Sequence, residues 1–178
     1  PPNGSVPTAN INTVTSLDLS NNLNGLNIAN LTGIEDFIAL TYLNCYNNQL
    51  TNLNVNNNTS LTSLNCGFNQ LTNLDVSNNT ALTYLNCYNN QILSLDISNN
   101  IFLTSLSCNT NQLTSLDVSL NTALSDLRCY ANPISTLDVS FNTSLTMLQC
   151  WNNQLTTLDL SNNINLQNLF CNSNQLTD

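Results

Sequence analysis

One segment of 21 residues recurs along most of the chain, and this repeat constrains the fold more than any other feature. Its first leucine returns in seven copies, at Leu40, Leu61, Leu82, Leu103, Leu124, Leu145 and Leu166. A cysteine follows five residues later in each copy, and the chain has no cysteine elsewhere: Cys45, Cys66, Cys87, Cys108, Cys129, Cys150 and Cys171. A fixed period of this length is typical of a solenoid, in which each repeat buries its apolar side against its neighbours.

Within each copy, apolar residues alternate with polar ones in two places. We number the positions of one coil from 1 to 21, starting at its first leucine. Leucine at position 4 is followed by cysteine at position 6, and apolar residues at positions 14 and 16 repeat this spacing. A period of two is typical of a strand with one side facing inward. The sequence therefore predicts a β-rich solenoid with two parallel sheets of short strands around a narrow core.

Asparagine marks two further positions of every complete coil. It occupies position 9 in all seven copies and position 19 in six, from Asn48 and Asn58 to Asn174 and Asn163. A buried asparagine at a corner can bond the backbone of its own turn and of the next coil, where polar groups have no strand partner. We therefore expect two turned corners per coil.

The ends of the chain depart from this pattern. Residues 1–13 are predicted to be an extended lead-in, and residues 14–39 an atypical N-terminal capping coil that covers the end of the core. Leu31, Ile34, Phe37 and Leu40 lie three residues apart, which favours a short helical or 3₁₀ turn. Residues 40–178 comprise the seven 21-residue repeats, the last incomplete. We therefore expect a monomeric fragment of a longer chain.

Charge is scarce and almost all of it is negative. The chain has one arginine, no lysine and no histidine, and its net charge is −9. A basic surface for phosphates is absent, so nucleic-acid binding and attraction to anionic membranes are not expected. No apolar run approaches the length of a membrane span, so membrane insertion is not expected either.

The pattern Leu40-x-x-Leu43-x-Cys45-x-x-Asn48-x-Leu50 resembles the leucine-rich-repeat signature, with cysteine in place of the third leucine. It recurs in all seven coils, and the resemblance covers residues 14–178. The short period and the Leu-Asp-Val-Ser-Asn-Asn half are similar to bacterial internalin-type repeats with a cysteine ladder, and to secreted repeats of flavobacteria. This resemblance implies a right-handed rod or shallow horseshoe, an extracellular or cell-surface location, and a role in adhesion or recognition.

The seven cysteines invite a disulfide or metal interpretation, and geometry argues against both. One cysteine per coil forms a straight column, whereas a tetrahedral zinc site needs four ligands around one point. Parallel Cβ vectors on adjacent coils also give the wrong torsion for a disulfide. We expect seven reduced thiols that act as small buried apolar groups.

A second column is acidic. Position 15 holds Asp75, Asp96, Asp117, Asp138 and Asp159, after Asn54 in the first coil. Stacked carboxylates could bind calcium between coils, or act as paired acids on a glycan. The alternative is that they are solvated and bond nearby turn amides and serines. We favour the structural interpretation, and the aspartates are only weak candidates for metal ligands.

The outward positions 3, 5 and 7 vary from coil to coil, unlike the columns. We call the surface formed by these positions the strand face. All five tyrosines, the single tryptophan and the single arginine lie on it, and these residue types dominate binding hot spots. Phe68 lies beside it at position 8. The predicted ligand-binding residues are Tyr42, Tyr46, Phe68, Tyr84, Tyr88, Asp126, Arg128, Tyr130, Trp151 and Phe170.

Several classes of function remain open on the sequence alone. We favour a non-catalytic recognition or adhesion module whose strand face binds a protein or carbohydrate, with no cofactor. A structural spacer in a larger surface protein is the alternative. An enzyme is disfavoured because histidine and lysine are absent and no serine lies beside a base, which leaves only the acid column for glycan chemistry. Ice binding is a remote alternative, from the threonine column at Thr41, Thr62, Thr83 and Thr104.

Overall fold

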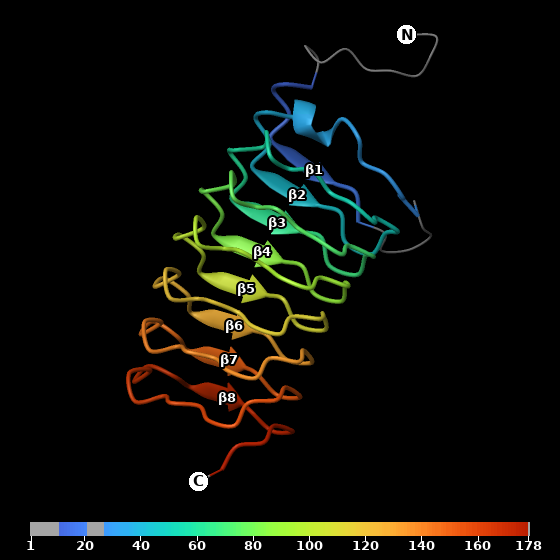
Figure 1. Ribbon diagram of the computed structural model, residues 1–178. Coiled ribbons are helices and arrows are strands. Elements are labelled where there is room, and N and C mark those ends of the chain that lie inside the picture. The colour runs from blue at the N-terminus through green and yellow to red at the C-terminus, as the bar shows by residue number, and fades with distance from the viewer. Residues whose placement is uncertain (1–10, 21–26, 178) are drawn as a thin grey trace, which may run out of the picture.

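The chain forms a rod of stacked coils, each of which adds one short strand to a single sheet (Figure 1). The computed structural model describes residues 11–20 and 27–177. Each strand is three residues long, and the eight parallel strands follow one another in chain order. Their bounds are β1 Ser16–Asp18, β2 Tyr42–Asn44, β3 Ser63–Asn65, β4 Tyr84–Asn86, β5 Ser105–Ser107, β6 Asp126–Arg128, β7 Met147–Gln149 and β8 Asn168–Phe170. The predicted solenoid is thus confirmed.

Neighbouring strands pair at equivalent repeat positions. Leu43 lies opposite Leu64, and Leu64 lies opposite Leu85. These inward leucines are fully buried. A slip of one residue would turn them to solvent, so the buried column fixes the register. Every side chain of the strand face is consequently aligned with its counterpart one coil away.

The core is a continuous apolar column inside the rod. Positions 1, 4, 6, 11, 14 and 16 are buried in the coils from Leu40 to Val139. The last coil is more open, because Leu169 is 41% exposed and no further described coil covers it. Stability therefore comes from coil-on-coil burial, as in other repeat proteins.

The prediction of a second sheet was wrong for the residues that the structure describes, which contain one sheet. Leu53 and Val55 do alternate inward with an exposed Asn54 between them, so this segment is extended as expected. The Val55 carbonyl, however, accepts the N–H of Asn58 at 3.0 Å and the Nδ2 of Asn79 at 3.0 Å. Asparagine side chains and turns thus occupy the carbonyl groups that a second ladder would need.

The two asparagine columns join the coils differently. At position 9, Asn69 Nδ2 donates to the Cys45 carbonyl at 3.0 Å, and its Oδ1 accepts the N–H of Leu50 at 3.0 Å. At position 19, Asn79 Nδ2 donates to the carbonyls of Val55 and Asn58, but its Oδ1 is buried without a hydrogen-bond partner among the described residues. The first column is saturated, whereas the second leaves one acceptor unused in each coil.

The N-terminal end has the predicted helical turn. The 3₁₀ helix η2 spans Ile34–Asp36, and Ile34 is buried against the first coil. Asn58 Nδ2 ties it down by donating to the carbonyls of Ile34 and Phe37 at 2.9 and 3.0 Å. Residues 1–10 of the predicted lead-in lie outside the described residues, as do residues 21–26 of the predicted capping coil. The domain boundaries at residues 13 and 39 stay predictions.

The cysteines are unpaired, and six of them are buried. Burial removes the thiolate from water and raises the pKa of Cys45, Cys87 and Cys150 to about 12. The pKa values of the Cys66, Cys108 and Cys129 thiols are raised by the same cause. A neutral thiol is the form that this core accepts.

One turn position per coil has a left-handed backbone. Position 8 has a φ between 52° and 57° in all seven coils, although none of its residues is glycine: Asn47, Phe68, Asn89, Thr110, Ala131, Asn152 and Ser173. Asparagine tolerates this region, whereas a β-branched residue such as Thr110 is strained there.

We expect the protein to lose stability above about pH 8.5, where thiols ionise in the unfolded chain but not in the folded one. The unfolded state then holds fewer protons, so the free energy of unfolding falls by about 1.4 kcal/mol per pH unit for each buried thiol. Urea denaturation between pH 8 and 10 measures the slope. Cys108→Ala should make the slope of the free energy of unfolding against pH shallower by the contribution of one thiol. An unchanged slope would contradict this account.

We expect Thr110→Asn to raise the free energy of unfolding by about 1 kcal/mol, because asparagine adopts the left-handed conformation at lower cost. The matched control is Asn89→Thr, at the same position one coil earlier, which should lower stability by a similar amount. Both are measured by urea denaturation, and changes of the same sign would contradict the prediction.

Candidate ligand-binding face

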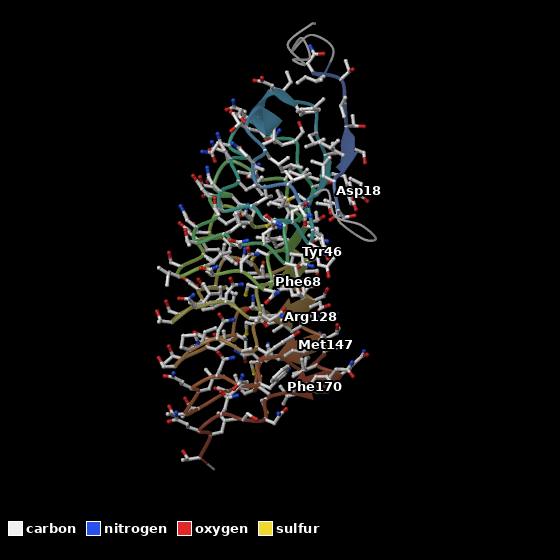
Figure 2. All side chains as sticks on the ribbon, turned by 90° about the vertical axis from the view of Figure 1, so that its right-hand side faces the viewer. Asp18, Tyr46, Phe68, Arg128, Met147 and Phe170 are labelled. Carbon is white, nitrogen blue, oxygen red and sulfur yellow. The ribbon has the colours of Figure 1, made fainter. Side chains whose placement is uncertain are left out.

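The strand face runs along one side of the rod. Figure 2 shows Tyr46, Phe68, Arg128, Met147 and Phe170 following one another down this side. Tyr42, Tyr84 and Phe170 are each more than a third exposed. The strand face is an uneven surface of aromatic rings and polar groups on the rigid, in-register sheet.

Three rings near the N-terminal end form a closed cluster. Tyr46 and Tyr88, two coils apart, stack with centroids 6.1 Å apart, and their hydroxyl oxygens are 3.2 Å apart. Phe68 meets both rings edge-on, with centroids 5.5 and 5.1 Å away. Burial in this cluster raises the pKa of the Tyr88 hydroxyl. Most of the aromatic contacts of these three rings are therefore with one another.

Gly67 makes this cluster possible. A Cβ atom at Gly67 would lie 2.7 Å from Cδ1 and 2.8 Å from Cε1 of Tyr88, too close for a real contact. The Tyr88 ring therefore lies over the missing side chain, which lets it reach past one coil to Tyr46.

A second ring pair lies farther along the face. Tyr130 and Trp151, on adjacent coils, stack with centroids 4.3 Å apart and planes inclined by 12°. Tyr88 thus leans toward the N-terminal coils, whereas Tyr130 stacks on the ring of the next coil toward the C-terminus.

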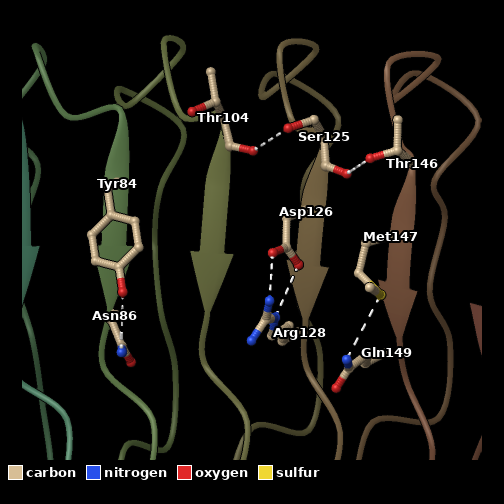
Figure 3. A network of polar contacts seen from close by, with 9 residues as sticks. All are labelled: Tyr84, Asn86, Thr104, Ser125, Asp126, Arg128, Thr146, Met147 and Gln149. Atoms are coloured by element: carbon tan, nitrogen blue, oxygen red, sulfur yellow. Dashed lines mark hydrogen bonds and ion pairs between the residues drawn. The ribbon is translucent and has the colours of Figure 1, made fainter. Parts of the chain in front are cut away.

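An ion pair lies on β6 (Figure 3). Arg128 donates to Asp126 through both Nε and Nη2, at 3.0 and 2.8 Å. This two-bond contact raises the pKa of the guanidinium group. The sole arginine is therefore already paired on its own strand.

A hollow of about 380 Å³ opens over β5, between the two ring pairs. Its floor consists of the small residues Ser105, Ser107 and Asn109. The other lining residues come from the neighbouring coils: Tyr84, Asn86, Tyr88, Asp126, Arg128 and Tyr130.

Half of the predicted ligand-binding residues line this hollow, namely Tyr84, Tyr88, Asp126, Arg128 and Tyr130. Tyr42, Tyr46, Phe68, Trp151 and Phe170 do not line it. Sequence reasoning missed Asn86, Ser105, Ser107 and Asn109, because it looked for large side chains. Small outward residues between bulky coils were only a partial signal, because the second coil has them too and there the Tyr88 ring covers Gly67.

The aspartates of the acid column make hydrogen bonds within their own turns. In five of the coils an aspartate Oδ1 accepts the N–H of the serine two residues later, at 2.8–3.0 Å. Hydrogen bonds from these serines lower the pKa of the five carboxyls. Asn54 makes the same turn bond without a charge, to the N–H of Asn56 at 3.2 Å. These contacts fit the structural interpretation of the column.

Two other features bear on alternatives to binding. Among the described residues, no group of three or more acidic, cysteine or histidine side chains is placed to hold a metal ion. The hydroxyls of the threonine column donate to carbonyls of the preceding coil, as Thr62 does to Thr41 at 3.1 Å. Figure 3 shows the continuation of this column through Ser125 and Thr146. These hydroxyls have a structural role in joining coils.

The structure is similar to solved structures of bacterial repeat proteins. The functional domain of InlJ from Listeria monocytogenes, which includes a cysteine ladder, is 34% identical over 96% of this chain and 47% of its own, with a TM-score of 0.53. The internalin InlF of the same species is 30% identical over 95% and 51%, with a TM-score of 0.87. A leucine-rich-repeat protein of Leptospira interrogans is 27% identical over 97% and 47%, with a TM-score of 0.86.

This chain spans about half the length of those structures. No protein-family model matches the sequence, and no curated protein matches it. The neighbours confirm the predicted resemblance to internalin-type repeats with a cysteine ladder, and they support a protein-interaction repeat module in general. Among the described residues, no helix has the length and apolar character needed to cross a membrane.

We expect Gly67→Ala to lower the free energy of unfolding by about 1 kcal/mol, because the new methyl group displaces Tyr88 from its stack on Tyr46. Urea denaturation measures the loss. In a Tyr88→Ala background the same substitution should cost much less. Equal costs in both backgrounds would contradict the proposed contact.

Proposed function

We propose, on the premise that this chain is an internalin-like leucine-rich-repeat solenoid with a cysteine ladder, that it is a non-catalytic recognition module whose strand face binds a protein partner. The observation that carries this proposal is the distribution of variable side chains. The leucine, cysteine and asparagine columns repeat almost unchanged. The strand face instead differs between each coil and the next, and only the first and third coils share the same three residues, Tyr-Asn-Tyr. Because the core has already fixed the fold, the variation is free to encode a partner.

The rings of the strand face suit such a role. Tyr88, Tyr130 and Trp151 are partly buried and held by stacking, so they lose little further freedom when a partner covers them. Tyrosine, tryptophan and arginine are also the residues that dominate interface energetics. The sheet beneath them is rigid, which favours a preformed surface over one that orders on binding.

An extracellular or cell-surface location and a role in adhesion form part of this proposal. The similarity to internalins supports them, and so does a surface rich in asparagine, serine and threonine that carries one basic residue. A rod of this kind also suits the alternative role of spacer, in which the stacked columns matter and the strand face does not.

We expect the combined substitution of Tyr88, Tyr130 and Trp151 by alanine to weaken adhesion at least tenfold. The measurement is retention of protein-coated beads on a panel of cultured cells and immobilised host surface proteins. The matched control changes Asp96, Asp117 and Asp138 to asparagine, which leaves the strand face intact and should retain wild-type binding.

Circular dichroism shows whether this triple variant stays folded. We expect it to, because the three rings lie outside the core and the leucine, cysteine and asparagine columns are unchanged. If the folded ring variant adheres as well as the wild type, or the wild type adheres to nothing, the recognition proposal fails and the spacer role is favoured.

A further inference from the structure

We infer that the hollow over β5 is a preformed subsite for one neutral sugar ring, a pyranose unit carried by the partner. The inference rests on the proposed function in that it takes the strand face as the binding surface. It goes beyond that function by naming the ligand chemistry of one place on the face.

The hollow exists because the rings on its two sides are held apart. The Tyr88 ring lies over Gly67 and stacks on Tyr46, and the Tyr130 ring is held in its stack on Trp151 of the next coil. Asn109, at the same position in the coil between them, is buried and does not fill the gap. The walls are therefore fixed before any ligand arrives.

The second coil shows what happens without this separation. Its outward residues Ser63, Asn65 and Gly67 are as small as those of the coil that carries β5. There the Tyr88 ring covers Gly67 and packs against Phe68. Small residues alone do not make a hollow, and the direction in which the neighbouring rings lean decides where space is left.

The floor offers hydrogen-bonding groups that the protein leaves unpaired or only weakly bonded. Among the described residues, the side-chain hydroxyls of Ser105 and Ser107 have no hydrogen-bond partner. The side-chain amides of Asn86 and Asn109 also line the space. Asn86 Oδ1 accepts the Tyr88 N–H at 3.2 Å, but the Nδ2 groups of Asn86 and Asn109 make only long bonds, of 3.4 and 3.5 Å. Such groups suit a ligand with many hydroxyls and poorly suit an apolar side chain, which would leave them unpaired.

The walls of the hollow supply aromatic surface. A pyranose presents apolar C–H groups as well as hydroxyls, and aromatic side chains beside a few convergent polar groups are typical of small-ligand sites. Tyr84, Tyr88 and Tyr130 bring rings to the hollow from the two neighbouring coils. Its volume of about 380 Å³ lies in the range of small-ligand pockets, about 300–1,000 Å³.

Charge selects a neutral ligand. Arg128 is engaged through two hydrogen bonds with Asp126, so neither group offers a free charge to the hollow. The chain as a whole carries −9, which repels a carboxylated sugar. While the ion pair remains intact, the Asp126 carboxylate can still accept hydrogen bonds from sugar hydroxyls, and the Arg128 guanidinium group can still donate to them.

Saturation-transfer NMR on the intact protein tests the inference. The probes are the methyl glycosides of glucose, galactose, mannose and N-acetylglucosamine, with methyl glucuronide as the anionic probe. Saturation of the aromatic protons should transfer to at least one neutral glycoside and not to the glucuronide.

The decisive variant is Ser105→Tyr, which fills the hollow. Tyrosine already occupies the same repeat position at Tyr42 and Tyr84, so the coil accommodates it. The matched control is Ser63→Tyr, at the equivalent place in the second coil. We expect Ser105→Tyr to reduce the transfer at least tenfold and Ser63→Tyr to leave it unchanged.

Three results would overturn the subsite: no transfer to any neutral glycoside, equal transfer to the glucuronide, or transfer that persists in folded Ser105→Tyr. None of them bears on whether the ring variant loses adhesion to cells and proteins. Failure of the sugar subsite is thus distinguishable from failure of the recognition proposal.

Discussion

The fold depends on side-chain amides that complete the backbone pairing between coils at their corners. A three-residue strand bonds only a small part of each coil to the next, and the turns would otherwise bury polar groups without partners. At position 9 both ends of the asparagine amide reach the preceding coil, as Asn69 shows. Loss of such a bond inside the rod costs about 1–3 kcal/mol per unpaired group, so these residues are as essential to stacking as the leucines.

The inner parts of this design were predictable because they repeat without change. The spacing of Leu43 and Cys45, repeated in every coil, predicted the strand and which of its sides faces inward. The repeated asparagines predicted the corners. The second sheet was wrongly predicted at Leu53 and Val55, since alternation indicates an extended segment but not where its carbonyls bond. The left-handed turn at position 8 gave no sequence signal, because asparagine, phenylalanine, threonine, alanine and serine all occur there.

The candidate site was predictable as a face but not as a shape. Periodicity places Tyr88, Arg128 and Tyr130 on one side of the sheet, and composition marks them as binding residues. The hollow depends instead on where the neighbouring rings lie: Tyr88 lies over Gly67, and Tyr130 stacks on Trp151. Such information lies in contacts between coils, and a pattern read one coil at a time does not contain it.

The identical joints between coils make the rod extensible in whole units. Inserting or deleting one 21-residue unit restores the same leucine register and the same asparagine contacts on both sides of the change. Between Tyr88 and Tyr130, however, such an event would bring the two rings together or separate them by one more strand. Gain or loss of one whole repeat would therefore resize a recognition surface in a single step, with no new core to evolve.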